Sequence, residues 1–357
     1  MGRHNKYIKW WFWSGAALVF IMLLVGGITR LTGSGLSITE WNLIMGAKPP
    51  INQTEWMAAF SQYKQFPQYQ QLNASMTLTQ FKYIFFWEYL HRLLGRIIGI
   101  IFIIPFLFFW FRGYFNRKTW RQALFLLFLG MLQGAMGWFM VKSGLVGVPY
   151  VSHYRLALHL LLAFLITGCC IWFALGLKQD EIVKKQTKPF GLKKWAIGIG
   201  FLLIIQITWG AFTAGLNAGY IYNTFPLMAG GFVPPNAWAM QPLILNFFEN
   251  AATVQWFHRI NGTVLGLLII VLWVKSLNKN IGPILKRKTH LLLGLVLTQY
   301  LLGILTLLFH VPVFVAVAHQ AVAMLLWFAW LAYYHHLKKY RLYHQINYTQ
   351  HSIFKKY

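Results

Sequence analysis

Four histidines lie inside long apolar segments of this 357-residue chain, and their positions suggest metal chemistry. They are His91, His159, His258 and His319. A histidine in a membrane span is costly and therefore a functional candidate, although a single one can simply hydrogen-bond to a neighbouring helix. Two imidazoles that face each other across a helical bundle can hold a haem iron at both axial positions. The four histidines therefore predict two such sites.

The competing metal for these histidines is zinc, which binds four ligands in a tetrahedron. Zinc is disfavoured because the histidines fall into separate halves of the chain and no cysteine or second carboxylate joins them. The other eight of the twelve histidines lie at span ends or in the terminal segments, where we expect interfacial or solvated positions. Of these, His310 is expected nearest to the layer of the four candidates.

Glu88 is the one acidic residue that we place inside a span, three residues before His91 and on the same helical face. A carboxyl group there could exchange protons during catalysis, and we favour this over a purely structural pair with Arg92 at i,i+4. Arg92 and Arg259 each follow a candidate histidine, and Arg96 lies a turn deeper. Such guanidinium groups could bind haem propionates, with snorkelling to lipid headgroups as the alternative.

The elements that must position these residues are eight apolar stretches, each able to cross about 30 Å of hydrocarbon at about 1.5 Å per residue. Because 58% of the residues are hydrophobic and only 11% are charged, an ordinary soluble domain is excluded. We predict an all-α polytopic membrane protein whose first span is a retained helix. The expected spans are 9–29, 84–111, 120–141, 154–177, 195–215, 253–274, 289–309 and 311–334.

The net charge of +26 follows this topology and does not mark a nucleic-acid-binding surface. Lysine and arginine gather before the first span, in every second connection and in the tail, whereas the long connection 216–252 has neither. Because basic loops stay on the cytoplasmic side, both termini should be cytoplasmic. The basic segments should contact anionic lipid, and no nucleic-acid partner is expected.

The chain repeats itself as two units of four spans. The second and sixth spans share the pattern His-Arg-x-x-Gly-x-x-x-Gly, beginning at His91 and His258, and Gln-x-x-x-Gly recurs in the third, fifth and seventh. With an even number of spans per unit, both units enter from the same side, which predicts two pseudo-symmetric four-helix bundles. The glycines could permit close helix packing, clearance for a flat macrocycle, or both.

The two cysteines, Cys169 and Cys170, are adjacent in the fourth span. Neighbouring residues of a helix point in different directions, so a disulfide between them is not expected. We interpret both as small packing residues away from the candidate site.

Longer motifs resemble one known family. They are ITRLTGSGLSITEW at 28–41, FKYIFFWEYLHRLLGR at 81–96, YRLALHL at 154–160, WFHR at 256–259 and AHQ at 318–320. This combination is similar to haem A synthase, in the form shared by mitochondria and alphaproteobacteria, and the resemblance extends over 21–330. One branch of that family carries a cysteine pair in its first outer loop, which this sequence lacks, so any redox role of such a pair does not transfer.

The resemblance implies an oxidoreductase that converts the C8 methyl of haem O, through a hydroxymethyl intermediate (haem I), to the formyl group of haem A for cytochrome oxidase assembly. It implies a haem b ligated by His258 and His319, with the substrate haem near His91, His159 and Glu88. Two histidines on the substrate iron would fill both axial positions, which suits electron transfer better than oxygen activation. The sequence leaves open whether both stay bound.

Two other functions fit parts of the pattern. A dihaem cytochrome that passes electrons from quinol would also use four histidines in two bundles, but it does not explain a glutamate in one half only. A transporter built from parallel repeats predicts polar groups at the bilayer midplane, whereas here they cluster in one outer layer.

The expected organisation is a substrate-haem bundle over 1–177, a basic cytoplasmic linker over 178–194, a haem b bundle over 195–335 and a basic cytoplasmic tail over 336–357. The expected partners are haem O, a haem O synthase (protohaem farnesyltransferase), an electron donor that the sequence does not identify, and the lipid of a bacterial inner membrane. The pattern is also compatible with a homo-oligomer.

The alternation of basic and non-basic connections makes the topology testable. Reporter fusions placed within 49–80 and 219–250 should report the periplasm, because the positive-inside rule puts both connections outside. A cytoplasmic signal from either fusion would contradict the topology and the placement of all four histidines in one outer layer.

Overall fold

The computed structural model describes residues 3–39, 48–145, 149–177, 191–277 and 281–354, with side chains from 4 to 338. Within these ranges the chain is helical, without a β-strand, and eight helices are long and apolar enough to cross a membrane. The predicted fold class and number of spans are confirmed. The end of the 28–41 motif and most of the basic linker, 178–190, lie outside the described residues.

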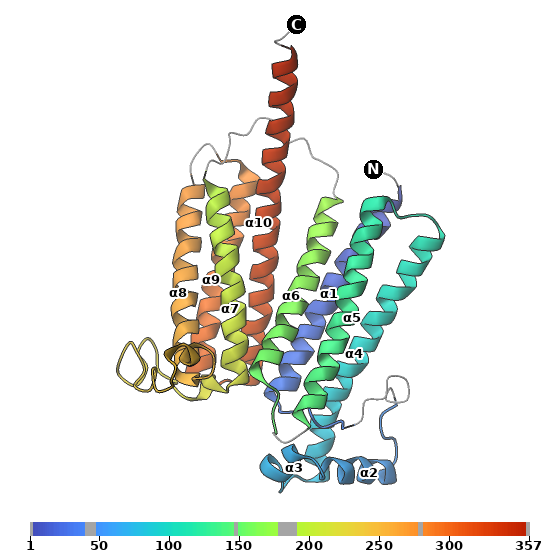
Figure 1. Cartoon of the computed structure of the whole chain (residues 1–357), viewed down its shortest axis with the longest axis vertical. Coiled ribbons are helices and arrows are strands. Elements are labelled where there is room, and N and C mark those ends of the chain that lie inside the picture. Colours follow the sequence, from blue (N-terminus) through green and yellow to red (C-terminus); the bar gives the residue numbers. More distant parts are fainter. Residues whose placement is uncertain (1–2, 40–47, 146–148, 178–190, 278–280, 355–357) are drawn as a thin grey trace.

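The spanning helices form two groups of four that stand side by side (Figure 1). The first bundle consists of α1 (Arg3–Leu31), α4 (Leu78–Phe111), α5 (Arg117–Gly144) and α6 (His153–Gly176). The second bundle consists of α7 (Leu192–Gly215), α8 (Ala251–Ser276), α9 (Pro283–Leu308) and α10 (Val313–Phe354). We call the end at which α4, α6, α8 and α10 begin the outer end; α1 begins and α10 ends at the opposite end (Figure 1).

Two helix boundaries differ from those expected from hydropathy. α4 begins at Leu78 instead of near residue 84, because Thr77 and Gln80 form a capping box that starts the helix before its apolar part. α10 continues to Phe354, through the segment expected to be a separate tail. The length of the apolar segment therefore predicts the membrane-crossing part of a helix, whereas in α4 a polar capping box determines where the helix begins.

The first bundle is covered at its outer end by the connection between α1 and α4. This connection contains α2 (Gln53–Tyr63) and α3 (Pro67–Leu72), which lie across the end of the bundle (Figure 1). An aromatic cluster attaches them to α4, since the ring of Phe81 stacks on Phe60 at 5.0 Å and on Tyr63 at 5.2 Å between centroids. Apolar burial of these three rings fixes the cover to the start of α4.

The connection between α7 and α8 covers the outer end of the second bundle. It holds two short 3-10 helices, η2 (Ala218–Tyr220) and η3 (Leu243–Phe247). Its backbone is held by buried amides: the side chain of Asn250, the N-cap of α8, donates to the carbonyl of Asn236 at 2.7 Å and to the side-chain oxygen of Asn246 at 3.0 Å. Side-chain amides thus satisfy the loop backbone at the point where the chain re-enters a helix.

The two bundles meet along a seam in which α6 packs against α7 and α10, and α1 packs against α10. Trp327 of α10 crosses this seam, since its indole N–H donates to the carbonyl of Phe164 on α6 at 3.1 Å. The nearby Trp330 joins two helices of the second bundle, since its indole N–H donates to the carbonyl of Ala196 on α7 at 2.7 Å. Gly200 on α7 is required here, because a Cβ at that position would overlap the ring of Trp330.

The cysteine pair lies in the inner half of α6, away from the outer end, and both thiols are free. Cys170 is buried in an apolar cluster, with its sulfur 3.4 Å from the point where Gly15 of α1 would carry a Cβ. These contacts agree with a packing role.

Replacing Cys169 and Cys170 together by alanine should therefore leave a folded, active protein. The expected cost is a small cavity worth about 1 kcal/mol of unfolding free energy, because each substitution removes a single sulfur atom and only that of Cys170 is buried. Thermal unfolding of the purified full chain and its activity are the measurements. Loss of activity at a normal protein level would show that the pair does more than pack.

Candidate haem sites

The four candidate histidines come from four helices and form two pairs. His91 on α4 and His159 on α6 are close enough for their rings to interact electrostatically, and so are His258 on α8 and His319 on α10. Each bundle thus brings together the two histidines that the sequence assigned to it. Among the described residues, no three histidine, cysteine or acidic side chains gather as a metal site, so the imidazoles stand as two separate pairs.

Each histidine ring packs against a glycine of the preceding spanning helix. The distance from the imidazole Cε1 to the point where a Cβ would stand on the glycine is 2.9 Å for His91 and Gly26, 3.4 Å for His159 and Gly137, 3.0 Å for His258 and Gly210, and 3.0 Å for His319 and Gly303. Three of these distances are too short for an ordinary Cβ contact. The glycines therefore admit the rings into the space between neighbouring helices.

The glycines of the His-Arg-x-x-Gly-x-x-x-Gly pattern divide into two kinds. Gly95 and Gly262 approach a side chain of the neighbouring helix, with Cβ points 3.2 Å from Met22 and 3.0 Å from Gln206. A Cβ on Gly99 or Gly266 would have no neighbouring atom within 4 Å. The outer glycine of each pair thus serves helix packing, whereas the inner one leaves clearance.

Three of the four histidines are accompanied by a glutamine one helical turn before their glycine. The side-chain nitrogens of Gln133, Gln206 and Gln299 lie 3.3, 3.4 and 3.3 Å from the Nε2 atoms of His159, His258 and His319 respectively. Gln133 and Gln206 also donate to the backbone carbonyl of the same histidine, at 3.2 and 3.1 Å. The third pair adds a 3.1 Å contact between the His319 Nδ1 and the carbonyl of Gln299.

The imidazole pairs fit a haem iron. The Nδ1 atoms of His91, His159 and His258 are buried and have no hydrogen-bond partner among the described residues. A neutral imidazole has one N–H to donate and one lone pair to share, and burying either without a partner is costly. An iron held by one nitrogen of each imidazole would use that ring's lone pair, to which the neighbouring glutamine amide can donate only while no iron is bound.

Glu88 is buried, and donors surround its carboxylate. Oε2 accepts from the backbone N–H of Ser37 at 2.6 Å, from the Ser37 hydroxyl at 2.7 Å and from the backbone N–H of Ile38 at 2.8 Å. Oε1 lies 2.6 Å from the guanidinium of Arg92, which also donates to the Ile38 carbonyl at 2.7 Å. Four donors suit an ionised carboxylate and anchor the segment after α1 onto α4.

The second bundle has a corresponding anchor in which a neutral glutamine replaces the carboxylate. The Gln255 side chain donates to the carbonyl of Tyr222 at 3.1 Å, and Arg259 donates to the carbonyls of Tyr222 at 2.7 Å and Thr224 at 2.8 Å. In both bundles, therefore, the pair of residues three before and one after the first histidine ties an outer connection to the helix. These contacts support a structural role for Glu88, which is the alternative to proton exchange.

Two further histidines have roles outside the pairs. His153 is buried at the start of α6, with its Nε2 3.7 Å from Oε2 of Glu249, and the Tyr154 hydroxyl donates to Oε1 of the same carboxylate at 2.6 Å. This cluster joins the first bundle to the outer connection of the second. His310 is exposed in the turn between α9 and α10, where its φ is 59°.

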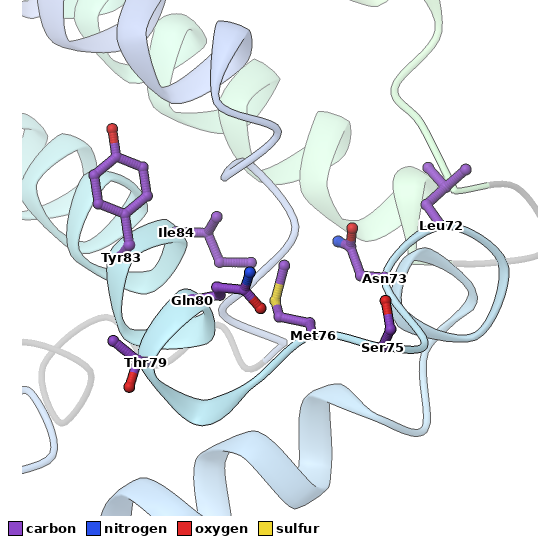
Figure 2. A pocket seen from close by; sticks show the side chains of 8 residues that line it. All are labelled: Leu72, Asn73, Ser75, Met76, Thr79, Gln80, Tyr83 and Ile84. Carbon is purple, nitrogen blue, oxygen red and sulfur yellow. The ribbon is translucent and has the colours of Figure 1, made fainter.

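A pocket of about 390 Å³ lies at the outer end of the first bundle, between the turn after α3 and the start of α4 (Figure 2). Its walls mix polar and apolar side chains and include none of the four histidines. The lining residues are Leu72, Asn73, Ser75, Met76, Thr79, Gln80, Tyr83 and Ile84. The pocket is thus separate from the imidazole pairs.

Sequence reasoning missed two sets of contacting residues. Ser37 and Ile38 gave no signal, because their hydrogen bonds to Glu88 join residues about 50 positions apart. The glutamines gave a signal in their Gln-x-x-x-Gly spacing, whose meaning appears only when the facing histidine is seen. Gly26 gave no such signal, because the residue four positions before it is Met22 and not a glutamine.

Comparison with known proteins gives one consistent result. The family model described as cytochrome oxidase assembly protein matches residues 9–331. The chain is 44% identical over 336 residues to a heme A synthase of Nitrosospira multiformis, covering 94% of each chain. It is 46% identical over 329 residues to one of Nitrosomonas eutropha, covering 92% of each, and 42% identical over 340 residues to one of Wolbachia pipientis wMel, covering 94% of this chain and 93% of the other.

The anchor around Glu88 predicts graded losses of stability. Glu88→Gln should cost about 3 kcal/mol or more, because it leaves Arg92 without its buried counter-charge. Ser37→Ala should cost about 1.5 kcal/mol, because it removes one hydrogen bond to a charged group. Thermal unfolding of both purified variants checks the order, and a Glu88→Gln protein that melts with the unsubstituted chain would contradict the anchoring role.

Proposed function

The chain belongs to the COX15-CtaA family of cytochrome oxidase assembly proteins, and from this membership we propose that it is a haem A synthase. It is an oxidoreductase that converts the C8 methyl of haem O, through a hydroxymethyl intermediate, to the formyl group of haem A. The observation that carries this function is the pair of neighbouring histidines in each bundle of a chain that matches the family over nearly its whole length.

The second bundle, within 195–335, is proposed to hold a resident haem b between His258 and His319. The Gln206 side chain donates to the backbone carbonyl of His258, and the Nδ1 of His319 lies 3.1 Å from the carbonyl of Gln299, so both contacts leave one ring nitrogen for iron. When bound, haem b supplies a relay that takes up and passes on single electrons. The protein's contribution there is to orient the two rings and to keep the site apolar.

The first bundle, within 1–177, is proposed to bind haem O, with His91 and His159 as ligands of the substrate iron. Gln133 holds His159 by donating to its backbone carbonyl at 3.2 Å. The anchored segment at Ser37 and Ile38 lies over the outer end of α4, where it limits the access of water.

The catalytic role of Glu88 remains a proposal that rests on the difference from Gln255, since methyl oxidation releases protons and electron relay needs little acid–base chemistry. The observed contacts favour an indirect role through the anchored loop. Arg92 and Arg259 are proposed to meet haem propionates, because each follows a ligand histidine on the outer side. In support, the Nε of Arg259 is buried and makes no hydrogen bond to any described residue, although the loop carbonyls occupy its terminal nitrogens.

The protein is a multi-pass membrane protein, and we propose a bacterial inner-membrane location with cytoplasmic termini. The common end at which α1 begins and α10 ends supports this orientation (Figure 1). The basic segments 178–194 and 336–357 are proposed to lie in the cytoplasm. A haem O synthase as substrate supplier, a separate electron donor and a homo-oligomer are proposed as partners, on the basis of the family alone.

Co-expression with a haem O synthase, followed by extraction of the haems and mass spectrometry, tests the function. Haem I and haem A should appear beside haem O only when this chain is present. Persistence of haem O alone, with both haem sites filled, would contradict the proposal and favour the dihaem cytochrome that relays electrons.

Variants of the same system assign the two bundles. His258→Ala or His319→Ala should lose the haem b spectrum, because one axial ligand is removed. Glu88→Gln should keep haem b and stall oxidation, and Ser37→Ala should lower the rate less if Glu88 acts through the loop. Normal haem A formation by Glu88→Gln would leave the assignment of the bundles resting on the family alone.

A further inference from the structure

The outer connections of the two bundles differ in charge. The connection between α7 and α8 contains no charged residue from position 216 to position 248. The connection between α1 and α4, which has the same place in the first bundle, carries Glu40, Lys48, Glu55 and Lys64. A segment of this length that lies in water ordinarily includes charged side chains, which keep its surface solvated. The two repeats thus cover their outer ends with chemically different polypeptide.

The uncharged connection also turns large apolar side chains outward. Phe232, just after the turn in which Gly230 adopts a φ of 85°, is 78% exposed. Other large side chains of this connection that are exposed are Tyr220, Ile221, Trp238, Leu243 and Ile244. The described part of the first connection exposes Ile51, Met57 and Leu72. Because the hydration of so much apolar surface is unfavourable, the second connection has the properties of a binding surface.

The backbone of the uncharged connection is hydrogen-bonded from inside the protein. The buried Asn246 side chain donates to the carbonyls of Met240 at 2.8 Å and Leu243 at 3.0 Å, and it accepts from the Met240 N–H at 3.0 Å. Gln255 and Arg259 of α8 donate to further carbonyls of the same segment. Water can satisfy the carbonyls of a solvated loop, whereas a segment in an apolar medium needs donors from the protein.

The exposed apolar surface continues onto the membrane-spanning part of α8. The ring of Trp238 contacts that of Trp256 on α8, with 5.8 Å between centroids. After Trp256, the exposed side chains of Ile260, Val264 and Leu267 follow along one face of the helix. Figure 1 shows the connection extending sideways from α8, level with its first turns, whereas α2 and α3 lie beyond the end of the first bundle. This is the level at which tryptophan and tyrosine gather at a membrane surface.

We propose that the connection 216–248 is inserted into the headgroup region of the lipid leaflet at the outer end, with lipid as its partner. Its apolar side chains face the acyl chains, and its backbone polar groups face the bundle. A protein partner fits less well, because protein interfaces surround an apolar centre with a polar rim and are enriched in arginine, and this segment has no charge. The inference goes beyond the proposed function and does not depend on haem.

The two bundles then have different surroundings at their outer ends. The first bundle is covered by charged polypeptide that stands in water. The second bundle is covered by uncharged polypeptide that stands in lipid. Its outer end is therefore shielded from bulk water twice, by the connection itself and by the lipid around the connection.

Fluorescent labels at two matched positions test this on the purified full-length protein in vesicles of phosphatidylcholine and phosphatidylglycerol. Ile244→Cys and Leu72→Cys place a label on the second and the first connection, at side chains that are 60% and 62% exposed, in a background with Cys169→Ala and Cys170→Ala. Part of the phosphatidylcholine then carries a doxyl quencher near its headgroup. The Ile244 label should lose about half or more of its fluorescence, because an inserted segment lies about 5–10 Å deep. Iodide on both sides of the membrane should quench the Leu72 label and spare the Ile244 label.

Photo-crosslinking reads the same positions in a chain that keeps both cysteines. Benzoylphenylalanine in place of Phe232 or Ile244 should give lipid adducts, detected by their added mass, and in place of Leu72 it should give none. Quenching of the Ile244 label by iodide, its escape from both quenchers, or adducts between two protein chains would overturn the inference. Equal lipid quenching at Leu72 would also overturn it, since charge would then not decide which connection enters lipid. Neither measurement uses haem O, so a failure of the proposed oxidation would leave both results unchanged.

Discussion

The contact between an imidazole ring and a glycine of the preceding helix is the constraint on which the rest of this structure depends. It occurs four times, once for each candidate ligand, and it sets how closely each pair of helices can approach. Imidazole is a polar group in an apolar medium, so its nitrogens need partners. Placing the ring on a glycine directs those nitrogens into the bundle, where the second histidine and iron can provide them.

The outer connections follow from the same requirement. Each bundle must close its outer end with polypeptide whose backbone groups are satisfied, because the histidines lie close to that end. In the first bundle a charged pair, Glu88 with Arg92, binds the returning chain; in the second, Gln255 with Arg259 does so. Both bundles thus use the same two positions to hold the outer connection, although the first position is a glutamate in one bundle and a glutamine in the other. Among the residues that the structure describes, that difference also places the one buried carboxylate, Glu88, beside the first histidine pair.

The two bundles are joined by side chains of α10, the helix that also carries His319. Trp327 donates across the seam to the carbonyl of Phe164 on α6, whereas Trp330 donates to the carbonyl of Ala196 on α7 within the second bundle. At the outer part of the seam the side chain of Gln320, next to His319, donates to the Leu23 carbonyl of α1 at 3.3 Å and approaches Gly27. Gln320, which follows His319, thus contacts α1, and Gly26 of α1 packs against His91. This contact connects the two histidine pairs.

The sequence by itself determined the helical fold and the eight spans, because apolar length is a local property of the chain. Its repeated motifs also predicted two units with one pair of histidines in each. It also favoured proton exchange for Glu88, since the spacing puts this carboxyl group on the same helical face as His91 and does not show what else surrounds it. Only the tertiary structure placed Ser37 and Ile38 around that carboxylate and matched each histidine with its glycine. Such contacts join residues far apart in the chain, so they depend on how helices pack and not on the order of residues within any one of them.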